Sequence, residues 1–388
     1  MNFSYTKEQE VLRNVVREFS DKEIAPRAAE FDRTAEFDYS LIEKLSKQGL
    51  LGVIMPKEYG GAGGNHIDQA IICEELARSS LTAMVATNMA WYMAYEVLKV
   101  GTEESKKRWI PYLFDGKKMG AHAGTEVNAG TDAASVGTWA KLEGDEWVIN
   151  GTKCFTSNLG KADFYFVTLR TAESRYGGIS TILVEKDTPG MTIGKRVDLI
   201  SNRAISNGEL IFENCRVPKE NLIGKLNRGF VDMMILYDVI RLYLAIGAVG
   251  IARAALEESM KFATERQQFG KPIAHFQLIR AMLADMATEI DAARLLTYRA
   301  LHMEQEGLRH TKETSMAKLY ASEVADRVTY KAVQIHGGYG LTMEFPVQRY
   351  WRDARLGSIG EGTSEIQRLI ISAELLKSDR IVLDSALD

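Results

Sequence analysis

Apolar residues recur at helical spacing through roughly the first 118 positions of the chain. In the stretch 8–28 one helical face carries five of them: Val11, Leu12, Val15, Val16 and Phe19. The stretch 38–53 repeats the pattern, and Gly49 is a candidate for the end of that helix. Residues 56–65 contain GGxGG without a strand and helix around it, which favours a flexible turn over a dinucleotide-binding loop. We predict an N-terminal helical domain over residues 1–118.

The pattern changes to short β-rich segments between residues 119 and 225. "EWVINGTKCFTS", "DFYFVTLRT", "GGISTILVEK" and "GELIFENCRVP" combine β-branched and aromatic residues, with Gly, Asp and Pro between them. The segment 142–147, "LEGDEW", predicts a hairpin turn. This spacing favours an antiparallel sheet or barrel over parallel βαβ units, as a middle β domain.

Long helical periodicity returns at residue 226 and predicts a C-terminal helix bundle over residues 226–388. Four small residues in the first of these helices permit a close approach of another helix, either within the chain or from a second subunit: Ala245, Gly247, Ala248 and Gly250. The predicted fold is therefore mostly α with a central β domain.

Composition excludes several classes of protein. The 388 residues include 48 basic and 52 acidic side chains, a net charge of -4, and form no basic stripe typical of nucleic-acid binding. The start of the sequence leads us to expect no signal peptide, and we expect no run near the 18 apolar residues of a membrane-spanning helix. The three cysteines form no CxxC pair, so we expect free buried thiols, no metal site and a cytoplasmic protein.

Glu361 is the first candidate for chemistry, because it stands between Gly360 and Gly362 in "SIGEGTSEIQR". Bare backbone on both sides would let a carboxylate reach a ligand, although a solvated residue before a helix is the commoner explanation. Ser364 and Gln367 fit a capping box, which predicts a helix start near Ser364.

Three further stretches accompany it in a fixed order. They are "GTEVNAGTD" (124–132), "ERQQFGKPI" (265–273) and "QIHGGYGLT" (334–342). Together with the GxKxxxxN pattern at 151–158 and the final EGTSEIQR, these motifs make the chain resemble the acyl-CoA dehydrogenase family over nearly its whole length. The resemblance implies the family's three-part architecture and FAD as cofactor.

The resemblance also implies a reaction. Enzymes of this family remove the α-proton of an acyl-CoA thioester while the β-hydrogen leaves as hydride to flavin N5. The matching base here is Glu361, whose backbone N–H would help to hold the thioester carbonyl as in an oxyanion hole. Some members place the base on a bundle helix instead. That position here is Ile240, which cannot accept a proton.

Cofactor and substrate contacts are carried over position by position. The flavin ring would be contacted by Thr125, Thr131, Phe155 and Ser157, and the remainder of FAD, across a subunit interface, by Arg266, Phe269, Gln334 and Gly338. Thr363 and Glu365 match FAD contacts beside the base. Asp238 and Arg241 match positions that line the CoA and acyl site, and a surface or interhelical ion pair is the alternative explanation for them. A shared site implies an oligomer, usually a homotetramer in this family.

Several positions depart from the family pattern. Val127 replaces the Pro of TEP, Thr131 replaces a Ser, and Phe155 replaces the tryptophan near the flavin, but these changes keep hydroxyl and aromatic character. Gly360 stands where many relatives carry Tyr, which would leave room for a bulky acyl group.

The segment 87–101 is expected to form the floor of the acyl pocket, with Asn88, Trp91, Tyr92 and Tyr95 as large, partly polar residues. Such a floor favours a short, branched, alicyclic or aromatic acyl group, whereas ordinary core packing is the alternative for these aromatics. We expect electrons to pass to an electron-transferring flavoprotein. The alternatives are an enoyl-CoA reductase working in reverse, an oxidase, which is usually a longer chain, and a scaffold without activity.

Overall fold

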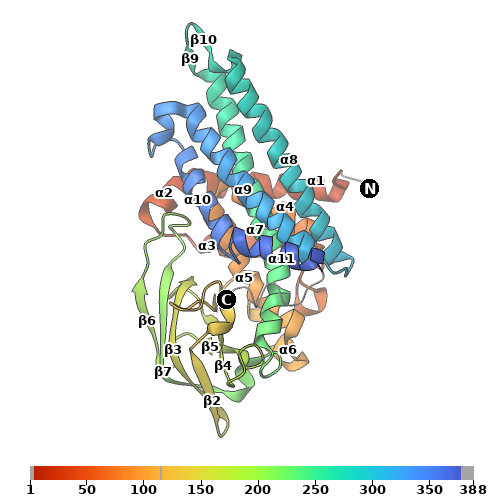
Figure 1. The fold of residues 1–388 in the computed structure, drawn as a ribbon, viewed down its shortest axis with the longest axis vertical. Coiled ribbons are helices and arrows are strands. Elements are labelled where there is room, and N and C mark those ends of the chain that lie inside the picture. The colour runs from red at the N-terminus through yellow and green to blue at the C-terminus, as the bar shows by residue number, and fades with distance from the viewer. Residues whose placement is uncertain (1–3, 114–115, 377–388) are drawn as a thin grey trace.

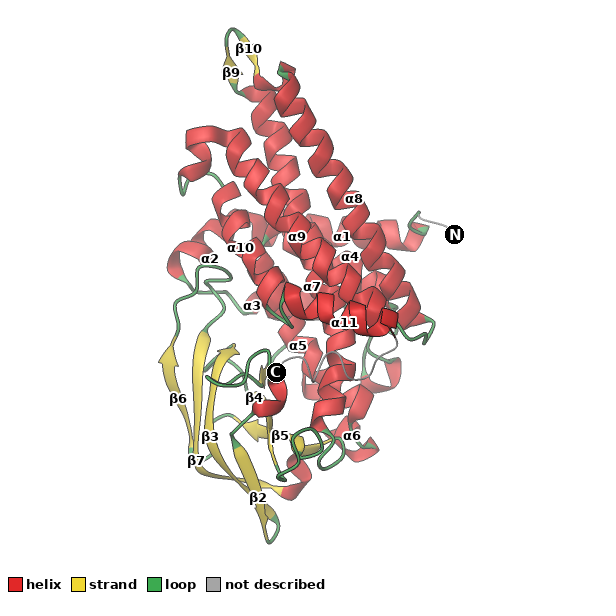
Figure 2. Ribbon diagram, in the orientation of Figure 1, coloured by secondary structure: helices red, strands yellow, loops and turns green. Residues whose placement is uncertain are grey.

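The computed structural model describes residues 4–113 and 116–376. Helices from both ends of the chain pack together, and the β domain lies beside their lower half (Figures 1 and 2). The predicted order of helices, sheet and helix bundle is confirmed. The limits at residues 118 and 225 stay predictions.

The N-terminal part contains the α-helices α1 (Lys7–Phe19), α2 (Ala28–Thr34), α3 (Ser40–Lys47), α4 (His66–Ser79), α5 (Leu81–Val100) and α6 (Glu103–Leu113). The predicted apolar face of α1 is only partly buried. Val16 and Phe19 are buried, but Val11 is 63% exposed and Val15 43% exposed. Helix α1 lies on the outside of the protein and packs against α4, so only a narrow part of its apolar face is buried.

Gly49 ends α3 in the way that its position suggested. It adopts φ +69° just after the cap residue, its N–H donates to Ser46 O at 2.9 Å, and Leu50 N–H donates to Leu45 O at 3.0 Å. This is the Schellman arrangement, in which a left-handed residue satisfies the last carbonyls of a helix. The chain then enters the 56–65 segment, a short 3₁₀ turn followed by loop.

The middle part forms one sheet. Its strands are β1 (Gly120–Ala123), β2 (Trp139–Glu143), β3 (Glu146–Ser157), β4 (Phe164–Arg170), β5 (Ile179–Glu185), β6 (Met191–Arg196), β7 (Asn207–Pro218) and β8 (Leu222–Ile223). The order is β6-β7-β3-β2-β4-β5-β8, with β1 beside β4. Most pairs are antiparallel as predicted, but β4 pairs in parallel with both β1 and β2. The hairpin turn falls between Glu143 and Glu146, inside the predicted segment.

The C-terminal part contains α7 (Gly229–Glu265), α8 (Gln277–Gln305), α9 (Thr311–His336), α10 (Val347–Ile359) and α11 (Ser364–Leu376). A small hairpin of β9 (Gln267–Gln268) and β10 (Lys271–Pro272) interrupts the helices and projects from the far end of the bundle (Figure 1).

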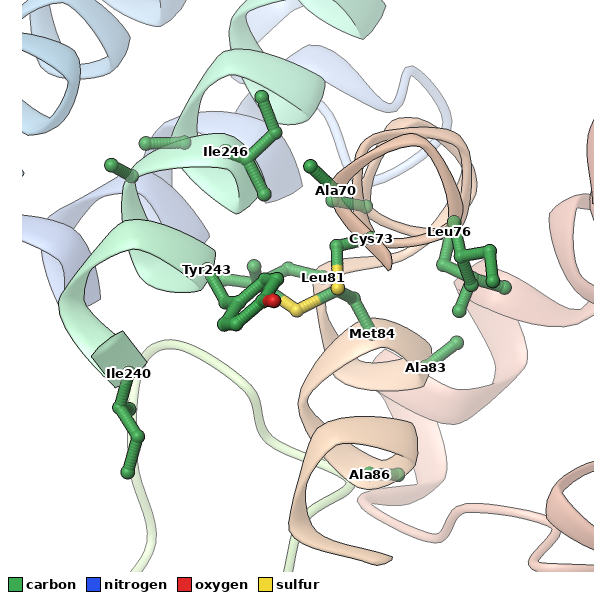
Figure 3. Packing of buried hydrophobic residues seen from close by; sticks show 14 of the residues in the cluster. Ala70, Cys73, Leu76, Leu81, Ala83, Met84, Ala86, Ile240, Tyr243 and Ile246 are labelled. Carbon is green, nitrogen blue, oxygen red and sulfur yellow. The ribbon is translucent and has the colours of Figure 1, made fainter. Parts of the chain in front are cut away.

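Helix α7 is the central element of the bundle. Its most apolar 18-residue window has a mean hydropathy of 1.8, so the expectation that no segment comes near a membrane-spanning helix was wrong. That window is 72% buried inside the protein, as expected of a core helix. A Cβ at Gly247 would lie 2.4 Å from Met84 Cε, and one at Gly250 2.7 Å from Glu74 O. The small residues therefore let α7 approach α5 and α4 within the chain, where Tyr243, Cys73 and Met84 meet (Figure 3).

Candidate active site

Glu361 lies in the short turn between α10 and α11, and its backbone conformation is unusual. It adopts φ +56°, and Gly362 follows with φ +93°. The left-handed region costs a residue with a side chain about 1–2 kcal/mol, so neighbouring groups must hold it.

Three side chains from three helices hold this turn. Arg241 Nε on α7 donates to Glu361 O at 2.8 Å. Lys318 Nζ on α9 donates to Gly362 O at 2.6 Å, and Gln367 Nε2 on α11 donates to the same oxygen at 3.0 Å. The backbone of Glu361 and of the next residue is thus held by two cations and an amide, while the Glu361 carboxyl group stays out of these contacts.

The flanking glycines differ in their reasons. Gly362 requires a missing side chain, since its φ is positive and a Cβ would lie 2.9 Å from Gln367 Nε2. Gly360 adopts an ordinary extended conformation, and a Cβ there would meet Leu356 O at 3.3 Å. The backbone angles of Gly360 therefore do not require glycine at this position.

Helix α11 begins at Ser364, as predicted, but the cap is the preceding residue. Thr363 Oγ1 accepts from Ile366 N–H at 3.3 Å, while the hydroxyl of Ser364 is buried and has no hydrogen-bond partner among the described residues. The predicted capping box at Ser364 and Gln367 is wrong, because Gln367 turns back to the Gly362 carbonyl.

Burial shapes the electrostatics of this turn. Desolvation raises the pKa of Glu361 above its ordinary value, and the charges of Arg241 and Lys318 oppose that rise. Burial also lowers the pKa of Lys318, to about 8. A carboxylate with a raised pKa beside fixed cations has the character of a general base.

The predicted floor residues lie on α5, and all but Tyr95, whose hydroxyl donates to Glu304, bond to one another. Trp91 Nε1 donates to Asn88 Oδ1 at 3.1 Å, and Asn88 Nδ2 donates to the Tyr92 hydroxyl at 3.1 Å. Trp91 is fully buried, with its ring 5.0 Å from that of Tyr243. Tyr92 lies close enough to Glu361 for that carboxylate to raise the pKa of its phenol, after the larger effect of burial.

Asp238 and Arg241 lie on one face of α7. Arg241 Nη1 is 3.6 Å from Asp238 Oδ1, and Asp238 Oδ2 accepts from Thr311 Oγ1 of α9 at 2.6 Å. The two residues therefore form an ion pair within α7, with Arg241 buried, and not the surface or interhelical pair considered from the sequence; Arg241 also contacts the Glu361 backbone.

The structure brings the predicted flavin-ring segments together at one edge of the β domain. Cys154 N–H donates to Thr125 O at 2.8 Å, which joins the 124–132 turn to the end of β3. Phe155 is 56% exposed with φ +54°, and Ser157 Oγ accepts from Asn207 Nδ2 at 3.2 Å. Thr131 is exposed in the same turn.

Lys153 and Glu126 organise this edge. Lys153 is fully buried, and its Nζ lies 2.7 Å from Glu126 Oε1 and 3.1 Å from Gly124 O. Burial lowers the pKa of Lys153 to about 8 although Glu126 opposes the effect. The Lys of the GxKxxxxN pattern was the available signal in the sequence, but no local pattern indicates that its partner is Glu126.

The second set of predicted cofactor residues lies far from Glu361. Arg266 caps the C-terminus of α7, 25 residues beyond Arg241, which corresponds to about 37 Å along a helix. Phe269 is 92% exposed in the β9–β10 hairpin, and Gln334 and Gly338 lie at the neighbouring end of α9. These residues are thus grouped at the end of the bundle away from the Arg241 contact with Glu361. Thr363 and Glu365 lie beside Glu361, at the start of α11.

The β-domain edge has the features that a large polar aromatic ligand requires. Three buried polar atoms near Phe155 and Ser157 have no hydrogen-bond partner among the residues described: Thr156 Oγ1, Asn158 Nδ2 and Asn207 Oδ1. An exposed ring beside them offers an apolar contact. These residues fit a flavin, whereas the described ranges contain no cluster of His, Cys, Asp and Glu that could hold a metal ion.

Comparison with known proteins identifies the chain. The models described as acyl-CoA dehydrogenase N-terminal, middle and C-terminal domains match residues 6–117, 121–215 and 227–376. The chain belongs to the acyl-CoA dehydrogenase family. It is thus a flavoprotein oxidoreductase that uses FAD.

Its relatives share nearly the whole length of the chain. The short-chain specific acyl-CoA dehydrogenase of Clostridium acetobutylicum is 42% identical, over 97% of this chain and all of the relative. The acryloyl-CoA reductase (NADH) of Anaerotignum propionicum is also 42% identical, over 97% of this chain and 96% of the relative.

Solved structures agree with this assignment. Butyryl-CoA dehydrogenase from Megasphaera elsdenii is 38% identical, with a TM-score of 0.94 over 97% of this chain and all of that chain. A chain from the structure described as the electron transferring flavoprotein of Acidaminococcus fermentans is 39% identical, with a TM-score of 0.95 and the same coverage. In this acyl-CoA dehydrogenase, Ile240, which matches the position where some family members place the base, is buried.

Proposed function

We propose that this acyl-CoA dehydrogenase oxidises a short, branched, alicyclic or aromatic acyl-CoA, with Glu361 removing the α-proton. The observation that carries the proposal is the turn at Glu361. The backbone of the turn is held by Arg241 and Lys318, while desolvation of the half-buried Glu361 raises the pKa of its carboxyl group. A fixed and poorly solvated carboxylate is suited to abstract a proton from carbon.

The remaining roles follow from position. FAD, when bound, takes up the β-hydrogen as hydride. Thr125, Thr131, Phe155 and Ser157 would hold its ring. The Glu361 N–H makes no hydrogen bond with any residue that the structure describes, so it is available to the thioester carbonyl. Negative charge that develops on that oxygen would be stabilised as the α-proton leaves.

The far residues Arg266, Phe269, Gln334 and Gly338 would contact the FAD of a neighbouring subunit. The length of α7 supports this assignment, because it separates them from Glu361 of their own chain. We therefore propose a homo-oligomer, with a tetramer as the expected state.

The short acyl class is supported by the relative named short-chain specific and by the solved butyryl-CoA dehydrogenase. The packed aromatic floor around Trp91 and Tyr92 also limits chain length. An electron-transferring flavoprotein is the proposed electron acceptor, supported by the solved structure that bears that name. We propose a cytoplasmic location, which suits three cysteines that are all free and buried.

An enoyl-CoA reductase is the second candidate. The acryloyl-CoA reductase is as similar to this chain as the short-chain dehydrogenase is. The same residues would serve it, with Glu361 in its protonated form delivering the α-proton.

The test is anaerobic reduction of the bound flavin by a panel of short linear, branched, cyclohexane-type, aromatic and long-chain acyl-CoA esters. One class should bleach the visible flavin band, and Glu361→Gln should keep FAD and ester binding but slow bleaching by several orders of magnitude. Bleaching of Glu361→Gln at the wild-type rate would exclude Glu361 as the base. If no ester bleaches the wild-type enzyme, reoxidation of the reduced enzyme by enoyl-CoA esters tests the reductase.

A further inference from the structure

Glu96 on α5 is a buried carboxyl group that no step described above uses. Its side chain is almost fully buried, and its Oε2 has no hydrogen-bond partner among the described residues. Buried polar groups without a partner are costly and uncommon in native proteins. Asp232, whose charge acts on Glu96, is paired with Arg228 through a 3.0 Å contact and, as another acid, offers Glu96 no compensation.

Two helix faces place Glu96 beside the Glu361 turn. On α5, Tyr92 and Glu96 are four residues apart and share a face, and Tyr92 lies near Glu361. On α7, Tyr237 lies one turn before Arg241, whose guanidinium carbon is 5.3 Å from the Tyr237 ring. The carboxyl groups of Glu361 and Glu96 both raise the pKa of the Tyr237 phenol, after burial. Tyr237 is therefore close enough to both acids for their charges to act on its phenol.

The antiparallel course of α5 and α7 gives the direction along this seam. Met84 of α5 lies against Gly247 of α7, and Glu96, twelve residues later, lies near Asp232. Asn88 and Tyr92 come between them in that order, about 6 Å apart along the helix. If Tyr92 lies beside the reacting thioester and Asn88 beside the end of the acyl group, Glu96 lies on the other side of the thioester. That side faces the pantetheine arm of coenzyme A.

The protonation state of Glu96 suits one kind of group. Burial, and secondarily Asp232, raise the pKa of Glu96 to about 8, so the carboxyl is largely neutral at pH 7. A neutral carboxyl offers one O–H donor and an acceptor oxygen. A secondary amide presents the complementary N–H and C=O, and the pantetheine arm of coenzyme A carries two such amides.

We propose that Glu96 binds an amide of the pantetheine arm and so positions the thioester at Glu361. The inference rests on the proposed site at Glu361. It assigns to this acyl-CoA dehydrogenase a positioning residue that contacts the coenzyme A part of the substrate, whereas other side chains contact the acyl group.

The test compares two thioesters of the acyl group that best bleaches the flavin: its coenzyme A ester and its ethanethiol ester, which lacks both amides. With Glu96→Leu, kcat/KM for the coenzyme A ester should fall about 3- to 10-fold, the equivalent of one lost hydrogen bond, whereas kcat/KM for the ethanethiol ester should not change. Glu96→Gln keeps a donor and an acceptor and should stay within about twofold of the wild type for both esters.

The outcomes separate this inference from the function on which it rests. Wild-type values of Glu96→Leu with the coenzyme A ester, or equal losses with both esters, would overturn the role of Glu96. Absence of flavin bleaching by either ester in the wild-type enzyme would instead count against the proposed function. Since Glu96→Leu removes an unpartnered buried acid, its thermal unfolding should occur at or above the wild-type temperature. If this variant fails to fold, Glu96→Met offers a second apolar replacement.

Discussion

The buried pair of Lys153 and Glu126 allows a quantitative prediction about the cofactor-binding edge. Lys153→Met keeps the aliphatic stem but removes the ammonium group that bonds Glu126 Oε1 and Gly124 O. Removing one partner of a buried ion pair costs about 3–5 kcal/mol. Glu126 keeps two backbone donors, Gly137 N–H at 2.7 Å and Thr138 N–H at 3.0 Å, and its side chain retains some contact with solvent. We therefore expect a loss near the lower limit, about 3 kcal/mol of unfolding free energy.

The same substitution should weaken FAD binding, because Lys153 fixes the carbonyl next to Thr125. Urea unfolding gives the stability change, and titration of the apoprotein with FAD gives the dissociation constant. Lys219→Met is the matched control in the same domain, since Lys219 pairs with Asp145 at the exposed surface and should cost under about 1 kcal/mol. The reasoning is refuted if Lys153→Met loses no more stability than Lys219→Met, or if its affinity for FAD equals that of the wild type.

Four further outcomes are expected. Trp91→Ala should widen the range of accepted acyl groups and lower stability by about 3–5 kcal/mol, and an unchanged substrate profile would make Trp91 a core residue only. Flavin reduction should decline as pH falls through the raised pKa of Glu361, and Arg241→Met should move that decline to higher pH in a stopped-flow profile, because a charge that lowers the pKa is lost. Glu361→Gln should be more stable than the wild type at pH 7, with the difference shrinking on acidification: a raised folded pKa favours the protonated native state at low pH, and that contribution is lost as pH rises. Phe269→Ala should promote subunit dissociation and FAD release in analytical ultracentrifugation, whereas a stable holo-oligomer would contradict the interface role.

Most of the fold could be predicted from the sequence because its signals are local. Periodicity distinguished helices from strands, and Gly49 marked a helix end through its freedom to adopt positive φ. The failures came from tertiary context. Val11 and Val15 look like core residues, but α1 lies on the surface, and the parallel pairing of β4 joins strands that are not adjacent in sequence.

The candidate site was predicted through motifs, and its supports were not. Glu361 stands out in the sequence, but no local pattern predicts that Lys318 of α9, 44 residues before Gly362, bonds the carbonyl of that next residue. Likewise, the sequence alone does not predict that Glu96 lies near the candidate site, because this depends on the packing of α5 against α7. Long-range partners of this kind depend on packing, which a single sequence does not report.

The length of α7 has a consequence for how the enzyme should be handled. One rigid helix carries Arg241 at the candidate base of its own subunit and Arg266 near the proposed cofactor site of another. In such an arrangement cofactor retention follows mass action among subunits. Dilution alone would then cause FAD to dissociate from the enzyme. A specific activity measured at low protein concentration would depend on the subunit assembly equilibrium as much as on the rate of the chemical step.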